Sequence, residues 1–270
     1  MLIDLHCHTT CSDGELTPQQ LLQLAEKQNI EVLAITDHDN IQAYAELKQI
    51  STTIKIITGV EFSTRWNKIG IHVVGLNFDI TAKSIQQAVN YQQNARQQRA
   101  KLISQKLEKI GLKNAYAQLI NKNPNRQIGR PDFAYLLIEQ GICQDFKQAF
   151  KKYLGAGKIG DIKSNWLSFT EVIQSITQAG GDAIIAHPLY YNMTNSKLKR
   201  LLRDFKQAGG VGLEVINGYQ NSDKTTYLCQ LCQKYKLKAS IGSDFHRMTN
   251  YSRLGIDTQI LPNTVKQIFA

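Results

Sequence analysis

The chain has 270 residues, of which 42% are hydrophobic and 20% are charged. This composition is typical of a folded globular protein and excludes a disordered or collagen-like chain. No apolar run reaches the roughly 18 residues that a membrane-spanning helix needs. The opening residues, MLIDLHCHTT, lack the basic and apolar regions of a secretory signal. Five cysteines, an odd number, indicate reduced thiols. We therefore expect a cytoplasmic protein with no membrane partner and no obligate protein partner.

The net charge of +10 is concentrated in one segment of the chain. Residues 85–165 hold 14 Lys and Arg against 5 Asp and Glu, an excess of +9, whereas the remainder holds 18 against 17. A basic segment raises the local concentration of anionic partners and speeds their encounter. The alternative is a solvated helical face that serves solubility.

Apolar runs rich in Ile and Val alternate with helical segments over most of the chain. Strands are expected at 2–7, 31–36, 54–62, 71–76, 182–187, 211–217 and 237–243. Helices are expected near 17–28, 40–50, 170–180, 195–208 and 223–236, with start signals at Thr17-Pro18 and Thr170-Glu171. This alternation favours an α/β fold with a parallel sheet or barrel.

The alternation stops between about residues 81 and 168. One long helix is predicted over 81–110, followed by shorter helices at 114–121, 131–140 and 144–154, with no strand pattern between them. The sequence therefore predicts a barrel built from residues 1–80 and 168–270, with residues 81–167 as a basic helical insertion that caps the substrate.

All six histidines lie at the ends of predicted strands, and three carboxylates accompany them. They are His6, His8, His38, His72, His187 and His246, with Asp13, Glu61 and Asp244. Residues two apart on a strand point the same way, so His6 and His8 can reach one metal ion. In a parallel barrel, the carboxyl ends of the strands share the face where active sites form.

His72 fits this arrangement only if its strand is antiparallel. It opens the predicted strand 71–76, about ten residues after Glu61, which is too few for a helical crossover. An antiparallel strand returns His72 to the same face, so all nine groups converge. A lone histidine at a strand end is more often structural, but nine buried polar groups without a partner would be very costly. Imidazole and carboxylate ligands suit Mn, Fe or Zn, and nine of them fit two or three divalent ions.

The two cysteines of the C-x-x-C motif, Cys229 and Cys232, lie within a predicted helix and have no second ligand pair nearby. We interpret them as buried helix residues rather than a zinc or redox site.

These motifs resemble the PHP (polymerase and histidinol phosphatase) family over nearly the whole chain. The motifs are His6-x-His8, Ser12-Asp13-Gly14, Thr36-Asp37-His38-Asp39, Gly59-x-Glu61, His72, Ala186-His187-Pro188 and Gly242-Ser243-Asp244-x-His246. The insertion resembles the branch that contains nucleoside 3′,5′-bisphosphate phosphatases and 5′-3′ exoribonucleases (ribonuclease AM). Its motifs are Arg99-Ala100, Gly129-Arg130-Pro131 and Tyr153-Leu154-Gly155-x-Gly157-Lys158.

The resemblance implies a distorted (β/α)7 barrel with a trinuclear metal site, most simply of manganese, with iron or zinc as alternatives. One ion would bind His6, His8, Glu61 and Asp244. A second would bind His72 and His187 and share Glu61. A third would bind Asp13, His38 and His246. The implied activity is hydrolysis of phosphate esters of nucleotides, either nucleoside 3′,5′-bisphosphates or the 5′ end of short RNA.

We expect a hydroxide that bridges the metal ions to attack phosphorus, with Asp13, His38 and Asp244 contributing to catalysis through it. Arg99, Arg130 and Lys158 are candidates for binding substrate phosphate, because the guanidinium group matches phosphate bidentately, and the alternative for each is a surface charge.

Two more acids and two departures from the family pattern complete the candidate site. Asp37 and Asp39 are expected either to orient imidazoles or to cap loops. Asp132 stands where the branch usually has histidine, and Tyr190 stands where it often has arginine. Both departures remove contacts to phosphate or nucleotide and bear on substrate preference.

Three other functions stay open at this point. A histidinol-phosphatase-like enzyme conflicts with the motifs of the insertion. A non-catalytic nucleic-acid-binding PHP module conflicts with the complete ligand set. An amidohydrolase would share the His-x-His motif, but this sequence lacks the context expected for the carboxylated lysine of such enzymes.

Overall fold

The computed structural model describes residues 1–122, 126–163, 165–262 and 264–269. Its centre is an eight-stranded sheet in the order β7-β6-β5-β4-β3-β2-β1-β8. The strands are β1 (Leu2–Cys7), β2 (Val32–Ile35), β3 (Lys55–Trp66), β4 (Ile69–Leu76), β5 (Asp182–Ile185), β6 (Gly212–Asn217), β7 (Lys238–Gly242) and β8 (Ile256–Asp257). The seven predicted strands are all present. The short β8, which pairs antiparallel with β1, was not predicted because two residues carry no periodicity.

The sheet is mixed and nearly closes into a barrel. Neighbouring strands are parallel except that β4 is antiparallel to both β3 and β5, and β8 to β1. The backbone N–H of Asp244 donates to His6 O at 2.7 Å, and that of His8 donates to Phe245 O at 2.8 Å, so β1 meets the segment after β7. A Cβ at Gly242 would lie 2.3 Å from His6 Cβ, which explains the glycine at this close approach. The predicted α/β barrel is confirmed.

The β3–β4 pair is a long hairpin whose turn is Asn67-Lys68. Both turn residues have positive φ values, 45° and 67°, which is the pattern of a type I′ hairpin turn. The two predicted strands, which end at 62 and start at 71, were therefore too short. Polar residues near the turn interrupt the apolar pattern from which the strands were predicted. His72 lies inside β4 and pairs with Ser63, rather than opening its strand. The predicted antiparallel direction, however, is confirmed.

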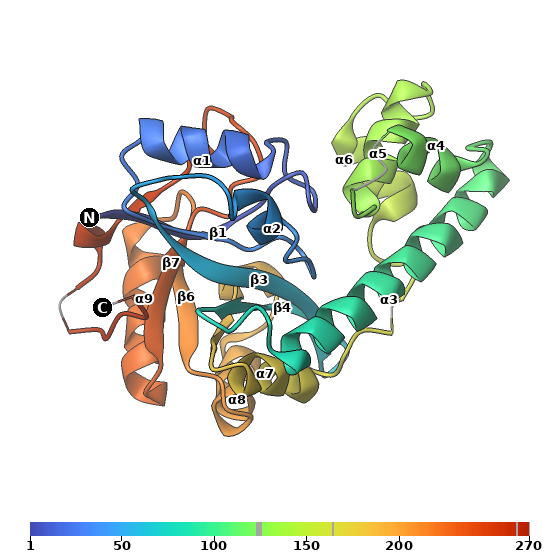
Figure 1. Cartoon of the computed structure of the whole chain (residues 1–270). Coiled ribbons are helices and arrows are strands. Elements are labelled where there is room, and N and C mark those ends of the chain that lie inside the picture. Colours follow the sequence, from blue (N-terminus) through green and yellow to red (C-terminus); the bar gives the residue numbers. More distant parts are fainter. Residues whose placement is uncertain (123–125, 164, 263, 270) are drawn as a thin grey trace.

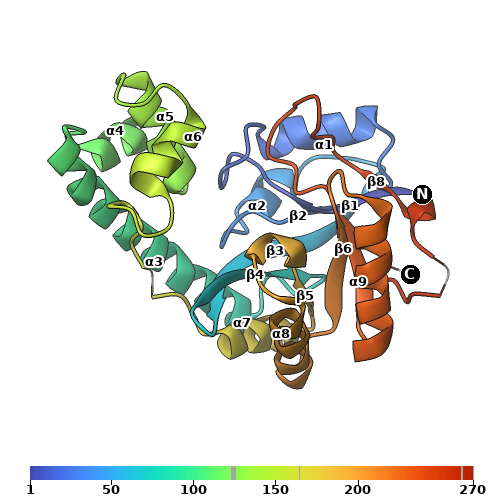
Figure 2. The same cartoon turned by 180° about the vertical axis from the view of Figure 1, so that it is seen from behind.

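Helices cover the outside of the barrel (Figures 1 and 2). They include α1 (Pro18–Lys27), α2 (Ala43–Leu47), α7 (Phe169–Gln178), α8 (Asn195–Gln207) and α9 (Ser222–Tyr235), with short 3-10 turns at Pro188–Tyr191 and Thr258–Ile260. Thr17 caps α1 as predicted, and its side chain accepts from Gln20 N. The start of α7 differs from the prediction, since Ser168 caps it in a capping box with Glu171. Cys229 and Cys232 are buried on α9, as expected.

The segment between β4 and α7 is helical. It contains α3 (Lys83–Leu107), α4 (Ala115–Lys122), α5 (Arg130–Glu139) and α6 (Phe146–Ala149), with a 3-10 turn at Glu108–Ile110 and a π-helical turn at Phe150–Leu154. α3 leads away from the sheet, and α4, α5 and α6 gather at its far end, opposite the chain termini (Figure 1). Phe133, Leu137, Ile103 and Leu154 belong to a hydrophobic cluster of their own. No helix in the described parts of the chain is long and apolar enough to span a bilayer.

Candidate metal centre

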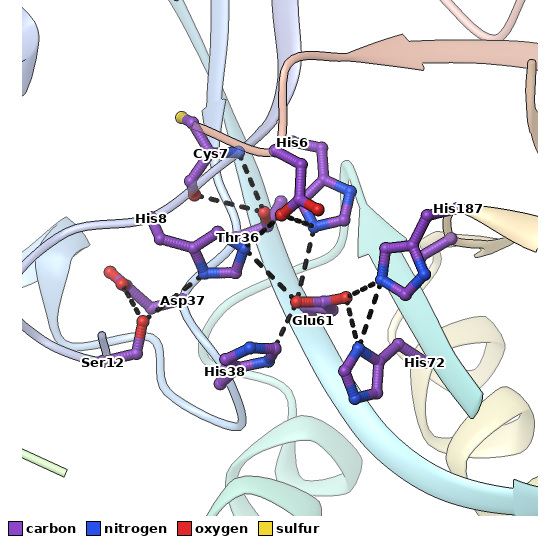
Figure 3. Close-up of polar contacts among 12 residues, drawn as sticks. His6, Cys7, His8, Ser12, Thr36, Asp37, His38, Glu61, His72 and His187 are labelled. Carbon is purple, nitrogen blue, oxygen red and sulfur yellow. Dashed lines mark hydrogen bonds and ion pairs between the residues drawn. The ribbon is translucent and has the colours of Figure 1, made fainter. Parts of the chain in front are cut away.

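Glu61 lies at the middle of a cluster of imidazoles at the carboxyl ends of the barrel strands (Figure 3). Its Oε1 is 2.7 Å from His72 Nδ1 and 2.9 Å from His187 Nε2. Its Oε2 is 2.9 Å from His38 Nδ1, 3.3 Å from His8 Nε2 and 3.4 Å from His6 Nε2. One carboxylate on β3 thus lies within 3.4 Å of histidine nitrogens from five separate chain positions.

The remaining predicted ligands flank this cluster. Asp244 Oδ1 is 3.2 Å from His8 Nε2 and 3.6 Å from His6 Nε2. Asp13 Oδ1 is 3.3 Å from His246 Nε2, and Asp13 Oδ2 is 3.8 Å from His38 Nε2. All nine predicted side chains are therefore brought together, and we call this set of nine candidate ligands the metal cluster.

Several of the atoms that could bind a metal ion are buried. Despite the short distances between them, they form no hydrogen bond with the described residues. They are His6 Nε2, His8 Nε2, His38 Nδ1, His187 Nδ1 and Glu61 Oε2. Orphaned buried polar atoms are costly unless something binds them. Three groups have ligand atoms within 4.8 Å of one another: His8, Asp13, His38 and His246; His6, His8 and Glu61; and His38, Glu61 and His72. The residues present fit divalent cations in number and in donor type.

Burial and neighbouring charge push the pKa values of these groups apart. Burial, with the nearby His246, lowers the pKa of His8 to about 3. Burial also opposes a charge on His246, but its bond to Asp13 and the charge of that carboxylate raise the pKa of His246 to about 9. Against the effect of burial, the surrounding imidazoles hold the pKa values of Asp13, Glu61 and Asp244 below their usual range. The three carboxylates therefore stay ionised, which is the form that ligates a metal ion.

Glu214 is a part of the site that the sequence analysis missed. It is buried on β6, and its Oε1 lies 2.9 Å from His6 Nδ1. Its Oε2 accepts from the backbone N–H of His187 at 2.6 Å and from Asn217 Nδ2 at 3.1 Å. His187 has a φ of 26°, a strained value for a residue other than glycine. One carboxylate thus orients the His6 ring on β1 and the backbone of His187, which follows β5. The sequence signal that could have found Glu214 was an acidic residue within the mainly apolar strand VGLEVIN.

Asp37 and Asp39 cap loops rather than orient imidazoles. Asp37 accepts from Thr9 N at 2.7 Å and Ser12 Oγ at 2.6 Å. Asp39 accepts from Arg96 Nε at 2.6 Å and Gln92 Nε2 at 2.8 Å, both on α3. Of the two alternatives left open by the sequence, the structure favours the loop caps, and Asp39 also ties α3 to the loop that carries His38.

A cavity of about 440 Å³ opens beside the metal cluster. Asp13, His38 and His72 line one part of it. The rest is lined by neutral residues, by one carboxylate, Asp161, and by five cationic side chains: Arg65, Lys68, Arg96, Arg99 and Arg130. Arg96 and Arg99 lie 5.2 and 5.8 Å from the ring centre of Trp166, which also lines the cavity. Burial, with the charges of Arg130 and Arg96, lowers the pKa of Arg99 to about 9 and outweighs the opposing effect of the nearby Asp161 carboxylate. The cavity is suited to an anionic ligand.

Two predicted substrate contacts lie in this cavity and one does not. Arg99 Nε donates to Ile162 O at 3.0 Å, and Arg130 Nη1 donates to Leu154 O at 3.3 Å, so both guanidinium groups are fixed by backbone carbonyls. Lys158 is exposed and is not among the residues that line the cavity.

Asp132 and Tyr190, the two departures from the family pattern, each make specific contacts. Asp132 is buried, caps the start of α5 by accepting from Gly129 N at 2.7 Å, and pairs with Arg126 at 2.8 Å. Arg126 also donates to Gly14 O in the loop that carries Asp13. The ring of Tyr190 stacks on His187 at a centroid distance of 5.7 Å, with most of the side chain exposed.

Comparison with known proteins agrees with this geometry. The family model of the PHP domain matches residues 4–214. A 5′-3′ exoribonuclease of Haemophilus influenzae is 40% identical over 266 residues, covering 97% of this chain and 96% of the relative. A 3′,5′-nucleoside bisphosphate phosphatase of Chromobacterium violaceum is 33% identical over 270 residues, covering 99% and 95%.

A solved structure from Chromobacterium violaceum, described as an amidohydrolase with bound sulfate and no metal, superimposes with a TM-score of 0.88. It is 33% identical, and the match covers 99% of this chain and 94% of that one. Family model, relatives and structure extend over the barrel and the helical segment alike. This chain belongs to the PHP domain family.

Proposed function

We propose that this protein is a metal-dependent phosphoesterase that hydrolyses nucleoside 3′,5′-bisphosphates and the 5′ end of short RNA. The observation that carries the proposal is the shared cavity, in which metal-ligating side chains lie beside five cationic ones. The metal cluster suits a reacting phosphoryl group, and the cations suit a second phosphate of the same substrate. The names of the relatives from Haemophilus influenzae and Chromobacterium violaceum support both substrates.

The two substrates present the same chemical features. Each has a phosphate on the 5′ oxygen of its first nucleoside and a phosphoryl group on the 3′ oxygen. Hydrolysis adds water to phosphorus, breaks the bond between phosphorus and the 3′ oxygen, and returns a proton to that oxygen. In both cases the first product is a nucleoside 5′-phosphate, so one site can serve both reactions.

Metal ions, when bound, would neutralise the phosphoryl oxygens and lower the pKa of the attacking water. We propose manganese, with iron or zinc as alternatives, held by His6, His8, Asp13, His38, Glu61, His72, His187, Asp244 and His246. The chain's own residues would bind and orient: Glu214 holds the His6 imidazole and the backbone of His187, and Arg99 and Arg130 hold the phosphate that does not react. Lys158 stays a prediction. The free state of all five cysteines supports a reducing compartment such as the cytoplasm.

We further propose that residues 81–167 act as a substrate cap on the barrel. The cluster around Phe133 gives this segment its own core, and α3 and α5 supply Arg96, Arg99 and Arg130 to the cavity. Asp39 and Arg96 join α3 to the His38 loop. The cap would thereby place the second phosphate relative to the metal centre.

A hydrolysis panel with added Mn²⁺ tests this function. It compares adenosine 3′,5′-bisphosphate, adenosine monophosphates, histidinol phosphate and 5′-phosphorylated short RNA. Five cations exceed what a monophosphate needs, so the bisphosphate and the RNA should be the preferred substrates. Turnover of histidinol phosphate alone would support the histidinol-phosphatase-like alternative instead. The absence of hydrolysis of all of them with Mn²⁺ would support the non-catalytic binding module.

Arg130→Ala tests the role of the cations within this function. It should raise KM for the bisphosphate at least tenfold, the equivalent of one lost charge-assisted contact of about 1.5–3 kcal/mol, and leave KM for an aryl phosphate nearly unchanged. Arg203→Ala, an exposed arginine on α8, is the matched control. An equal rise in KM for both substrates would count against recognition of a second phosphate by Arg130.

A further inference from the structure

Four large side chains are exposed on the loops that follow β5, β6 and β7. They are Tyr190, Tyr219, Met248 and Tyr251, with exposed fractions of 63%, 92%, 57% and 85%. We call the three tyrosines among them the aromatic rim. Because β5, β6 and β7 are parallel, their following loops lie at the end of the barrel that carries the metal cluster. Large apolar side chains exposed at the same end of a barrel are candidates for an interaction site.

The innermost member of the aromatic rim is held against the metal cluster. Tyr190 stacks on His187 with an angle of 21° between the rings. The next residue anchors the turn: Tyr191 Oη donates to Ala186 O at 2.6 Å and accepts from His72 N at 3.0 Å. Tyr190 is therefore presented at the edge of the site by a fixed backbone, rather than by a free loop.

The outer members line a separate hollow of about 510 Å³. Tyr219 and Tyr251 share it with Asn250, Arg253 and Gly218, and none of its described lining residues is acidic. Gly218 has a φ of 57°, its N–H donates to Gly242 O at 2.9 Å, and a Cβ there would meet Ser243 O at 2.9 Å. Ser243 directly precedes Asp244. The hollow therefore begins next to the metal cluster and offers tyrosine rings, an amide and a guanidinium group.

The hollow and the cationic cavity border different parts of the metal cluster. The cavity is lined by β3, β4, the loops after β1 and β2, and the helical segment, whereas the hollow is lined by the loops after β6 and β7 and by Ile256 of β8. A nucleoside bisphosphate ends at the reacting phosphoryl group and fills the cavity side alone. A single-stranded RNA continues beyond that phosphoryl group with further bases. Exposed tyrosine rings beside a positive group are the usual means by which proteins bind single-stranded bases without sequence preference.

We propose that the aromatic rim binds the bases that follow the scissile phosphodiester in single-stranded RNA. This inference rests on the proposed function and deepens it. The RNA reaction would require the aromatic rim, whereas the bisphosphate reaction on the same protein would not. Tyr190 receives the first of these bases, and Tyr219 and Tyr251 receive later ones. Arg253 neutralises a phosphate between them.

The test uses the full-length Tyr219→Ala/Tyr251→Ala double variant, with Tyr91→Ala as the control. Tyr91 is also an exposed tyrosine, but it lies on α3. The measurements are kcat/KM for adenosine 3′,5′-bisphosphate and for a 5′-phosphorylated six-nucleotide RNA, both with Mn²⁺. Loss of base stacking should lower kcat/KM for the RNA at least tenfold in the double variant. The bisphosphate value should stay within twofold, and the control should match the unsubstituted protein on both substrates.

Two further measurements separate the outcomes. Fluorescence anisotropy with the same RNA in the presence of a chelator reports binding without turnover, and the double variant should bind at least tenfold more weakly. An RNA that is abasic beyond its first nucleotide should remove the difference between the proteins. Equal RNA rates for the double variant and the unsubstituted protein would overturn the proposal, as would equal losses on both substrates. A change in oligomeric state without a change in RNA binding would identify a protein-binding surface and also overturn it.

Failure of this inference is distinguishable from failure of the proposed function. If the unsubstituted protein hydrolyses the bisphosphate but neither binds nor hydrolyses the RNA, the aromatic rim is not an RNA surface, and the proposed function stands for the bisphosphate alone. If it hydrolyses neither substrate, the proposed function itself fails.

Discussion

Replacing Glu214 with glutamine isolates the contribution of the buried carboxylate behind the metal centre. Glu214 accepts from His6 Nδ1 on one oxygen and from His187 N and Asn217 Nδ2 on the other. Glutamine has the same shape, but it offers one acceptor oxygen and one NH₂ donor group. In Glu214→Gln, either His6 Nδ1 or the His187 N–H must then face the NH₂ group of the glutamine instead of an acceptor oxygen. An unsatisfied buried donor costs about 1–3 kcal/mol, which corresponds to roughly 5- to 150-fold in an equilibrium constant.

The expected result for Glu214→Gln is a fall of about 10- to 100-fold in metal affinity, the range usual for residues that orient ligating histidines. Isothermal titration of metal-free protein with Mn²⁺ measures both affinity and the number of ions bound. Asp204→Asn, a change of the same kind on α8 at a carboxylate that accepts from the Trp66 indole, serves as the control and should bind Mn²⁺ normally. Unchanged Mn²⁺ affinity and stoichiometry in Glu214→Gln would show that Glu214 does not position His6 and His187 for metal binding.

Three more predictions concern the metal centre and the helical segment. Gly242→Ala should displace His6, because the added Cβ would lie 2.3 Å from His6 Cβ, and the variant should bind fewer Mn²⁺ ions by elemental analysis than the unsubstituted protein; full occupancy would contradict this. His246, with its pKa raised to about 9, is protonated at pH 7 in the metal-free protein and must lose that proton to ligate. Mn²⁺ affinity should therefore rise with pH up to about 9, and the calorimetric heat should depend on the ionisation enthalpy of the buffer; heats independent of the buffer would be inconsistent with it. Arg126→Ala leaves the buried Asp132 without its ion pair and should lower the free energy of unfolding by about 1–3 kcal/mol in urea titrations, whereas an unchanged transition would exclude a stabilising role.

The convergence of the histidines could be predicted from sequence because strand ends are a strong geometric constraint. His6 and His8 follow from the two-residue period of a strand. His72 follows from the short distance to Glu61, which demands a hairpin and hence an antiparallel strand. The hydrophobic periodicity of the strands and the long run of α3 made the fold class equally accessible.

Other parts of the site depend on contacts between segments that are distant in the chain. Glu214 meets His6 across 208 residues, and nothing in the local pattern of β6 states which side chain its carboxylate will reach. The roles of Asp39 and Asp132 depended on Arg96 and Arg126, whose side chains can reach several partners. The exact start of α7 was missed because Ser168 and Thr170 are both acceptable caps, and only the bond of Ser168 to Glu171 N decides between them.

We propose that nine side chains from across the barrel jointly bind divalent cations. Crystals grown or soaked with Mn²⁺ and measured at a wavelength where manganese scatters anomalously test it directly. Two or three strong anomalous peaks should surround Glu61 and reach Asp13 and Asp244. Crystals saturated with Mn²⁺ that show no peak there, or peaks that leave His72 and Asp244 uncoordinated, would contradict it.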